Sequence, residues 1–370
     1  MSLAQVQLEA DRKRLGRTPA LLRRKWQRMA VSPFAFLRGA SALWARAMRL
    51  EPSLLRGLPG TGTLVGDLHL ENIGTFRTAR GVTLHVNDFD ETFEGPWSFD
   101  VVRLLTSTLL ARPELGCTGL EVIALAQQVL EGHAAGVAGA TGRLPTTLTH
   151  AVAAAAVKTD DKYLAKRLEG PGRLLRDEKM PQAPAWCLPL VKRAVTAWSE
   201  ATRQPAPAKV LDLTRRIVGT GSLGVERLVA LVQVGDVSRL LELKEVRGSS
   251  FADVQADAAH LLEAWGRCLP RPPLELAAAA LGTLPIIVRP LFACDDKLAV
   301  EDFDRAALPQ TLRAIGVMAG EVHRRGAKTT AKWTAEHHRV LMDRAAHLAG
   351  LHEQAFVAFC QGVHAQFGDL

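Results

Sequence analysis

The chain lacks the features that mark a secreted, membrane-spanning or zinc-stabilised protein. Its five cysteines are an odd number and include no Cys-x-x-Cys pair, which argues against a disulfide framework or a structural zinc site. No run of about 18 apolar residues occurs, and the basic N-terminal segment lacks the apolar stretch of a signal peptide. We therefore expect a cytoplasmic protein with no membrane partner, whose cysteines are buried thiols.

The sequence also contains no His-x-His and no internal repeat, whereas its size and composition suit a globular enzyme. It has 370 residues, of which 48% are hydrophobic, and this is enough for two sizeable cores. The formal net charge is +8, and part of it lies in a basic stretch from Arg12 to Arg28. Because Trp26 is the only aromatic residue in that stretch, we expect a solvated helix face rather than a nucleic-acid site.

The most informative segment runs from Val65 to Glu91 and contains two polar clusters. In kinase catalytic loops an Asp orients the substrate hydroxyl, an Asn five residues later holds magnesium, and a further Asp at a strand end also holds metal. Asp67 and Asn72 have that spacing, and Asp88 follows a stretch that alternates like a short strand. Either cluster alone is compatible with a polar turn, but the two together predict a phosphoryl-transfer site.

Two residues near these clusters leave alternatives open. Asp90 is a second candidate for the metal-binding carboxylate, although Asp88 is favoured because it comes first after the strand. His69 either orients the loop or packs against its neighbours. The sequence Asp67-Leu68-His69 also resembles the Asp-x-His of dinuclear phosphatases, but the absence of His-x-His argues against a metallophosphoesterase.

A glycine-rich segment lies far downstream and predicts a second part of the site. Gly219, Gly221 and Gly224 form a Gly-x-Gly-x-x-Gly run whose backbone amides can approach phosphates closely. The following residues are rich in Val and Leu and predict a strand hairpin rather than a helix. Lys244 lies in the predicted return strand, where it would pair with the α- and β-phosphates of ATP.

The surroundings of Lys244 leave its role open in two ways. It is flanked by two glutamates, so a solvated strand lysine is the alternative to a phosphate ligand. The next segment, Phe251–Trp265, has apolar residues at helical spacing and carries two carboxylates that could orient the lysine. We favour Glu263 over Asp257 because its separation from Lys244 is the more typical of the two.

Four segments together resemble one bacterial family, called domain of unknown function 2252: Arg28–Gly39, Gly66–Asn72, Asn87–Glu91 and Phe99–Leu104. That family is similar to protein-kinase-like phosphotransferases, including the aminoglycoside and choline kinase group. The resemblance implies an α+β, two-lobed, protein-kinase-like fold with ATP and Mg²⁺ as cofactors, and it implies no particular substrate.

The resemblance extends to single positions. It matches Asp67 to the catalytic Asp, Asn72 and Asp88 to metal ligands, and Asp100 to the buried Asp that braces the catalytic loop. Val65 stands where the phosphotransferases have His, so we expect that brace to be missing. The segment from Leu312 to Gly326 is similar to the helix that precedes the catalytic loop in ordinary kinases.

The order of the motifs is unusual, because the catalytic motif precedes the glycine run by about 150 residues. A circular permutation explains this order, since domains tolerate it when their ends lie close together. We expect a mainly helical large lobe formed in part by residues 1–205, a small antiparallel-sheet lobe over 206–295, and helices over 296–370 that pack on the large lobe. The strand Leu284–Phe292 would enter a hinge whose backbone binds adenine.

These observations predict an ATP- and magnesium-dependent phosphotransferase. The short stretch between Asp88 and Asp100 leaves no room for a long activation segment, so we expect a hydroxyl of a small molecule as the acceptor. Arg38 is expected to face the site and to steady phosphate or an anionic substrate. A pseudokinase that only binds nucleotide and an enzyme that transfers AMP are the alternatives on the same fold, and the sequence does not indicate an oligomeric state.

Overall fold

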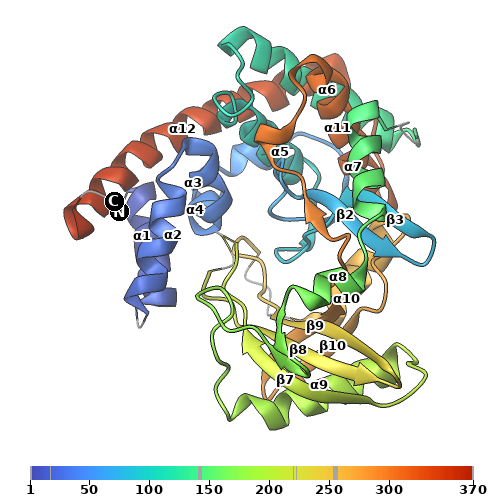
Figure 1. Ribbon diagram of the computed structural model, residues 1–370. Helices are drawn as coiled ribbons and strands as arrows, with labels where there is room; N and C mark the ends of the chain where they lie inside the picture. Colours follow the sequence, from blue (N-terminus) through green and yellow to red (C-terminus); the bar gives the residue numbers. More distant parts are fainter. Residues whose placement is uncertain are drawn as a thin grey trace.

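The computed structural model describes residues 2–16, 18–140, 144–219, 221, 223–252 and 257–368. Helices surround small antiparallel sheets in a mixed α+β arrangement (Figure 1). The helices are α1 Leu3–Leu15, α2 Pro19–Met29, α3 Pro33–Gly39, α4 Ser41–Leu50, α5 Ser98–Leu110, α6 Gly119–Val137, α7 Thr146–Ala156, α8 Asp160–Ala165, α9 Cys187–Ala201, α10 Ala258–Cys268, α11 Leu308–Arg325 and α12 Ala335–Phe367. The strands are β1 Thr61–Leu64, β2 Ile73–Thr78, β3 Gly81–Val86, β4 Phe93–Pro96, β5 Leu168–Gly170, β6 Arg173–Leu174, β7 Ala208–Arg215, β8 Arg227–Val234, β9 Val237–Glu245, β10 Ala277–Leu281, β11 Leu284–Pro290, β12 Asp296–Lys297 and β13 Ala327–Thr329.

The largest sheet is antiparallel and has two chemically different faces. Its strand order is β10-β11-β9-β8-β7, and α9 covers one face (Figure 1). Successive side chains of a strand point to opposite faces, so Leu241 and Leu243 of β9 join the apolar core under α9. Glu242 and Lys244 consequently point to the other face, toward the rest of the molecule.

The β8–β9 hairpin is the element that the sequence predicted most directly. Its register pairs Val234 with Val237, so Gly235 and Asp236 form the turn, and Gly235 has a φ of +58°. The predicted hairpin is therefore confirmed. The predicted helix over Phe251–Trp265 is shorter than expected, because α10 begins at Ala258, and residues 253–256 lie outside the described part of the chain.

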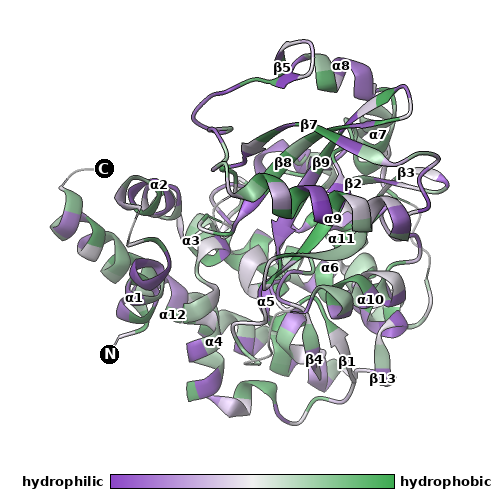
Figure 2. Ribbon diagram, turned by 90° about the horizontal axis from the view of Figure 1, so that it is seen from below, coloured by the Kyte–Doolittle hydropathy of each residue, from purple (hydrophilic) through white to green (hydrophobic). Residues whose placement is uncertain are grey.

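We call α3–α6 together with α11 and α12 the helical body. Helices α5, α6, α11 and α12 share the largest apolar cluster with the strands β1–β4 (Figure 2). The cluster is continuous because the inward faces of these helices are almost wholly apolar, and Leu104, Leu312 and Leu348 are completely buried in it. In the described part of the chain, no helix combines the length and apolarity needed to cross a membrane.

Helices α6 and α11 pack with their backbones in direct contact through four glycines. These are Gly132 and Gly136 in α6 and Gly316 and Gly320 in α11, in two facing Gly-x-x-x-Gly sequences. A Cβ atom on Gly316 would lie 2.1 Å from the carbonyl oxygen of Val129, and one on each of the other three would be equally close to the opposite backbone. Only glycine therefore fits at these four crossing positions.

The first helix packs against the end of the last one. Helix α1 packs against α4 and α12, and the Arg12 guanidinium donates to the Gln366 side-chain oxygen over 2.7 Å (Figure 1). Helix α1 is joined to α2 by Asp11, a buried carboxylate that accepts from Lys25 Nζ at 2.5 Å and from Trp26 Nε1 at 3.0 Å.

Candidate active site

A cavity of about 370 Å³ is lined on one side by β8, β9 and β11 and on the other by loops of the helical body. This volume is in the range of small-molecule sites. The predicted site residues that line it are Asp67, Asn72, Asp88, Lys244, Gly219 and Gly221. Residues up to 177 positions apart in the sequence, Asp67 and Lys244, therefore come together in one space.

The loop after β1 presents Asp67 and Asn72 to the cavity. Gly66 begins the loop with a φ of +85°, and a Cβ there would lie 2.0 Å from the carbonyl oxygen of Glu91, so no larger residue fits. The buried Asn72 donates its side-chain N–H to the Asp67 carbonyl over 2.7 Å. Since its amide nitrogen is used in this bond, the amide oxygen is the atom of Asn72 that a ligand can reach.

Asp67 is held by an arginine that the sequence reasoning did not single out. The Arg103 guanidinium on α5 forms an ion pair with the Asp67 carboxylate, stacks 4.8 Å from the Trp44 ring and donates to the Leu37 carbonyl. Burial raises the pKa of Asp67 to about 7 despite the opposing charge of Arg103. A carboxyl group with this pKa can exchange a proton near neutral pH.

Asp100 holds the same loop through its backbone, as the resemblance implied. Its buried carboxylate accepts the backbone N–H of Val65 at 2.7 Å and that of Gly66 at 2.9 Å. Val65 offers no imidazole at its own position, but His323 of α11 places its Nε2 3.1 Å from Asp100. His323 Nδ1 in turn lies 2.9 Å from Nε2 of His133 in α6. Two histidines therefore connect Asp100 to α11 and α6.

Replacing Asp100 by Asn should destabilise the protein by about 2 kcal/mol, because an amide nitrogen would face one of the two backbone donors. Urea unfolding followed by tryptophan fluorescence measures this loss. Asp257→Asn is the matched control, since Asp257 caps α10 and Asn caps equally well. Equal stability of the two variants would contradict the assigned brace.

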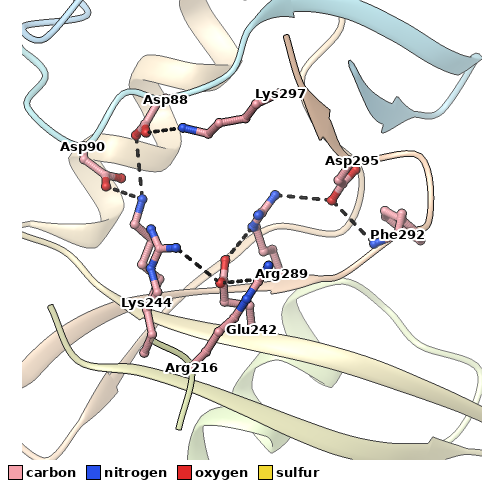
Figure 3. Close-up of polar contacts among 10 residues, drawn as sticks. Asp88, Asp90, Arg216, Glu242, Lys244, Arg289, Phe292, Asp295 and Lys297 are labelled. Carbon is pink, nitrogen blue, oxygen red and sulfur yellow. Dashed lines mark hydrogen bonds and ion pairs between the residues drawn. The ribbon is translucent and has the colours of Figure 1, made fainter. Parts of the chain in front are cut away.

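Lys244 and the acidic segment after β3 meet in the cavity (Figure 3). The Lys244 ammonium lies 3.7 Å from Asp88 Oδ1 and forms a closer ion pair with Asp90, while Lys297 Nζ lies 3.4 Å from Asp88 Oδ2. Burial alone would raise the pKa of Asp88, but Lys244 and Lys297 hold it well below its usual value. Asp88 is therefore ionised, whereas burial and the Asp88 charge raise the pKa of Asp90.

Next to Lys244 on the same face of β9, Glu242 lies among three arginines (Figure 3). The buried carboxylate is 2.7 Å from Arg216, 3.1 Å from Arg289 and 3.7 Å from Arg227. Burial would raise its pKa, but the three guanidinium groups hold it well below the ordinary value. The sequence signal for this buried network is the alternation of β9, in which charged residues alternate with leucines.

The predicted partner of Lys244 requires correction. Glu263 is 64% exposed and pairs with Arg267, one helical turn further along α10, while Asp257 accepts from the Ala259 amide at the start of that helix. The apolar side chains of Leu261, Ala264 and Trp265 form the buried face of α10, so Glu263 lies on the solvent face beside an arginine four residues away. In the described part of the chain, Lys244 is instead paired with Asp88 and Asp90.

The glycine run lies against the N-terminal helices. The carbonyl of Gly219 accepts from Arg28 of α2, and that of Gly221 accepts from Arg14 of α1 over 3.5 Å. Gly224, with a φ of +86°, does not line the cavity and packs so closely on Leu15 that a Cβ would lie 2.6 Å from it. The run also includes Thr220 and Ser222, which lie outside the described residues.

The segment after β11 does not offer its backbone to a nucleotide in the predicted way. The amide of Leu291 donates to the Leu240 carbonyl over 2.9 Å, and that of Ala293 donates to Asp160 over 2.8 Å. The amide of Phe292 contacts Asp295 at 3.5 Å. Because these three donors have partners within the protein, the predicted adenine contact would require them to be released.

Arg38 and His69 both line the cavity beside Asp67. Arg38 extends from α3 and pairs with Glu71 at 2.5 Å, so it faces the site as predicted and already has a carboxylate partner. The Nδ1 atom of His69 accepts from the Glu71 amide at 3.2 Å, and its ring meets the edge of Phe34. His69 therefore both orients the loop and packs, and burial lowers its pKa.

The oxygen ligands in the cavity suit a cation that is shared with phosphate. Among the described residues, no group of three or more His, Cys, Asp and Glu side chains could hold a metal ion by itself. Magnesium bound to phosphates needs only one or two protein carboxylates, and Asp88 could supply one in the cavity that Asn72 also lines.

One family model matches the chain, and it covers nearly all of it. Its description is "Uncharacterized protein conserved in bacteria (DUF2252)", and it matches residues 17–168 and 143–366. Searches of curated proteins and of solved structures found no match to the chain. The matched ranges include Asp67, Asn72, Asp88 and Lys244, but the description assigns no activity to them.

Proposed function

Since the chain belongs to the bacterial family DUF2252, whose description assigns no activity, we propose from the site itself an ATP- and magnesium-dependent phosphotransferase that acts on a hydroxyl of a small molecule. One observation carries the proposal: Asp67, Asn72, Asp88 and Lys244 line a single cavity. A catalytic carboxylate, two oxygen ligands for metal and a lysine for phosphate are the groups that phosphoryl transfer requires.

We further propose that the fold is a circularly permuted, two-lobed relative of the protein kinases. The helical body would be the large lobe, and the five-stranded sheet with α9 would be the small lobe. Three observations support this proposal: the hairpin with Lys244 follows a glycine run, Asp88 follows a strand, and the buried Asp100 holds the Asp67 loop. The contact between Arg12 and Gln366 fits a permutation, because it places the chain ends together.

In the proposed reaction Asp67 is the base. Its carboxylate would accept the proton of the acceptor hydroxyl as that oxygen attacks the terminal phosphorus of ATP, and ADP would leave. Arg103 fixes the position of the Asp67 carboxylate, and the bond from Asn72 to the Asp67 carbonyl fixes the loop. The role of these groups is therefore to orient the nucleophile rather than to form a covalent intermediate.

Asp88 and Asn72 would hold the magnesium ion. Asp88 suits this role because its carboxylate is ionised and already attracts two ammonium groups, those of Lys244 and Lys297. The bound ion would neutralise negative charge on the phosphates of ATP. Lys244 would then be released from Asp88 and Asp90 and would contact the phosphates from the sheet side.

The proposal predicts that Asp88→Asn weakens ATP binding in the presence of magnesium by roughly 100-fold or more, because the ionised metal ligand is lost. Calorimetric titration of ATP with and without Mg²⁺ measures the effect. Glu263→Gln is the control, since it removes a carboxylate that pairs only with Arg267 on the surface of α10. We expect that variant to bind ATP like the wild type.

The products of a subsequent incubation separate the possible activities. ADP formation with a range of hydroxyl compounds supports phosphoryl transfer, whereas release of pyrophosphate would indicate transfer of AMP. Magnesium-dependent ATP binding with neither product would indicate a pseudokinase. No ATP binding by the wild type at any magnesium concentration would refute the proposed function.

A further inference from the structure

The cavity has a second cationic end, beside Asp67, which the phosphotransferase roles do not use. Arg14 of α1, Arg38 of α3 and Arg247, which follows β9, all line it. The end lies beside Asp67 because Arg38 pairs with Glu71 of the same loop and because Gly66 packs on the Glu91 backbone. Arg14 is within electrostatic reach of Glu91 and of Arg247.

The carboxylates at this end already have partners. Glu71 pairs with Arg38 at 2.5 Å, and Glu245 pairs with Arg247 at 2.8 Å. Glu91 accepts the amide N–H of Ser250 at 2.5 Å and its hydroxyl at 2.9 Å. Each acidic group is therefore satisfied within the protein and is a poor site for a cationic ligand.

Arg14 differs from the other arginines of the cavity. Its side chain is exposed, and its contact is the 3.5 Å hydrogen bond to the Gly221 carbonyl. Within the described ranges, no carboxylate lies within ion-pair distance of Arg14. Arg247 donates to the carbonyl of Gly224, on which Arg14 packs, so the two like charges lie near each other. Asp11, Glu91 and Glu245 favour the Arg14 charge and Arg247 opposes it. An anion in contact with both guanidinium groups would reduce the repulsion between them.

The position of Arg14 is fixed by residues on both sides of it. One turn earlier in α1, Asp11 is buried with Lys25 and Trp26, and the next residue, Leu15, is buried against Gly224. The backbone of α1 is thus anchored directly before and after Arg14. Binding of an oxyanion there would therefore need the ordering of the Arg14 side chain but not of the helix that carries it.

From this arrangement we propose that the phosphoryl acceptor carries an oxyanion, a carboxylate or a phosphate, close to its reactive hydroxyl, and that Arg14 with Arg247 binds this group. The inference rests on the proposed function, because it assigns the acceptor side of the same cavity. Arg38, which lines the same cavity, would be a third positive group near the anion. Alcohols that carry an ammonium group would bind poorly, because they would place another positive charge beside Arg14.

The test uses the whole protein saturated with magnesium and a non-hydrolysable ATP analogue. Four compounds of similar size are titrated by calorimetry: glycerate, glycerol 3-phosphate, glycerol and ethanolamine. We expect glycerate or glycerol 3-phosphate to bind at least 10-fold more tightly than glycerol, and ethanolamine to bind no better than glycerol. The first two compounds distinguish a carboxylate from a phosphate as the preferred anion.

Variants then assign the binding to Arg14. Arg14→Gln should weaken binding of the anionic compound at least 10-fold, Arg14→Lys should restore part of it, and Lys13→Gln, an exposed neighbour, should leave it unchanged. Equal affinities for the four compounds, or no effect of Arg14→Gln, would overturn the inference. If the ATP analogue does not bind, the proposed function fails, and the same titrations without nucleotide still test the anion site.

Discussion

Asp67→Asn is expected to lower the rate of phosphoryl transfer by about 10³-fold, because general base catalysis is worth roughly 10² to 10⁴ and an amide cannot accept the proton. Asp67 lines the cavity with its carboxylate fixed by Arg103, and Asn has nearly the same shape. Magnesium-dependent ATP binding should therefore change by no more than about twofold. Single-turnover ADP formation measures the first quantity, and calorimetry measures the second.

The pH dependence of the wild type gives a second readout of the same residue. Burial raises the pKa of Asp67 to about 7, so the carboxyl group is protonated below that pH and ionised above it. A base must be ionised to accept a proton, and kcat/KM should therefore rise with pH through about 7. The control is Asp304→Asn, a change at the exposed start of a short 3₁₀ helix, which should keep the wild-type profile. A profile that stays flat from about pH 5.5 to 8.5 would argue against Asp67 as the base.

Gly316→Ala is expected to destabilise the protein by about 3 kcal/mol or more, which is large for the addition of one methyl group. The new Cβ would lie 2.1 Å from the backbone oxygen of Val129 and 3.0 Å from the backbone nitrogen of His133. Neither atom belongs to a flexible side chain, so α6 and α11 would have to move apart. That movement would also stretch the contact between His133 and His323.

Gly266→Ala provides the opposite result from the same chemical change. Gly266 lies on the exposed face of α10, and a Cβ there meets nothing within 4 Å. Alanine is a better helix former than glycine, so this variant should be more stable than the wild type by about 0.5 to 1 kcal/mol. Urea unfolding of both variants makes the comparison. If Gly316→Ala is also stabilised, the helices do not pack through their glycines.

The parts of the site that could be predicted from sequence are those with a local pattern. Asp67 and Asn72 are five residues apart on one loop, and Asp88 follows a strand of alternating residues. The hairpin around Gly235 was predictable for the same reason, because a Gly-Asp turn between two Val- and Leu-rich stretches fixes its own register.

Residues that act through the tertiary fold could not be found in this way. Arg103 reaches Asp67 from α5, and His323 reaches Asp100 across more than 200 positions of sequence. No spacing rule connects such pairs, because their proximity depends on how the helices pack. Glu263 shows that a suitable spacing can also mislead: its separation from Lys244 is typical, but the buried Leu261 and Trp265 define the inward face of α10 and leave Glu263 toward solvent.

The direct contact between the α6 and α11 backbones also determines which part of the molecule can move. Two helices that touch through glycines cannot slide past each other, because each carbonyl would collide with the opposite chain. His323 and Asp100 connect this rigid pair to the Asp67 loop. We therefore expect Asp67 to stay in place when the cavity opens, so that opening moves the sheet and carries Lys244 toward or away from Asp88.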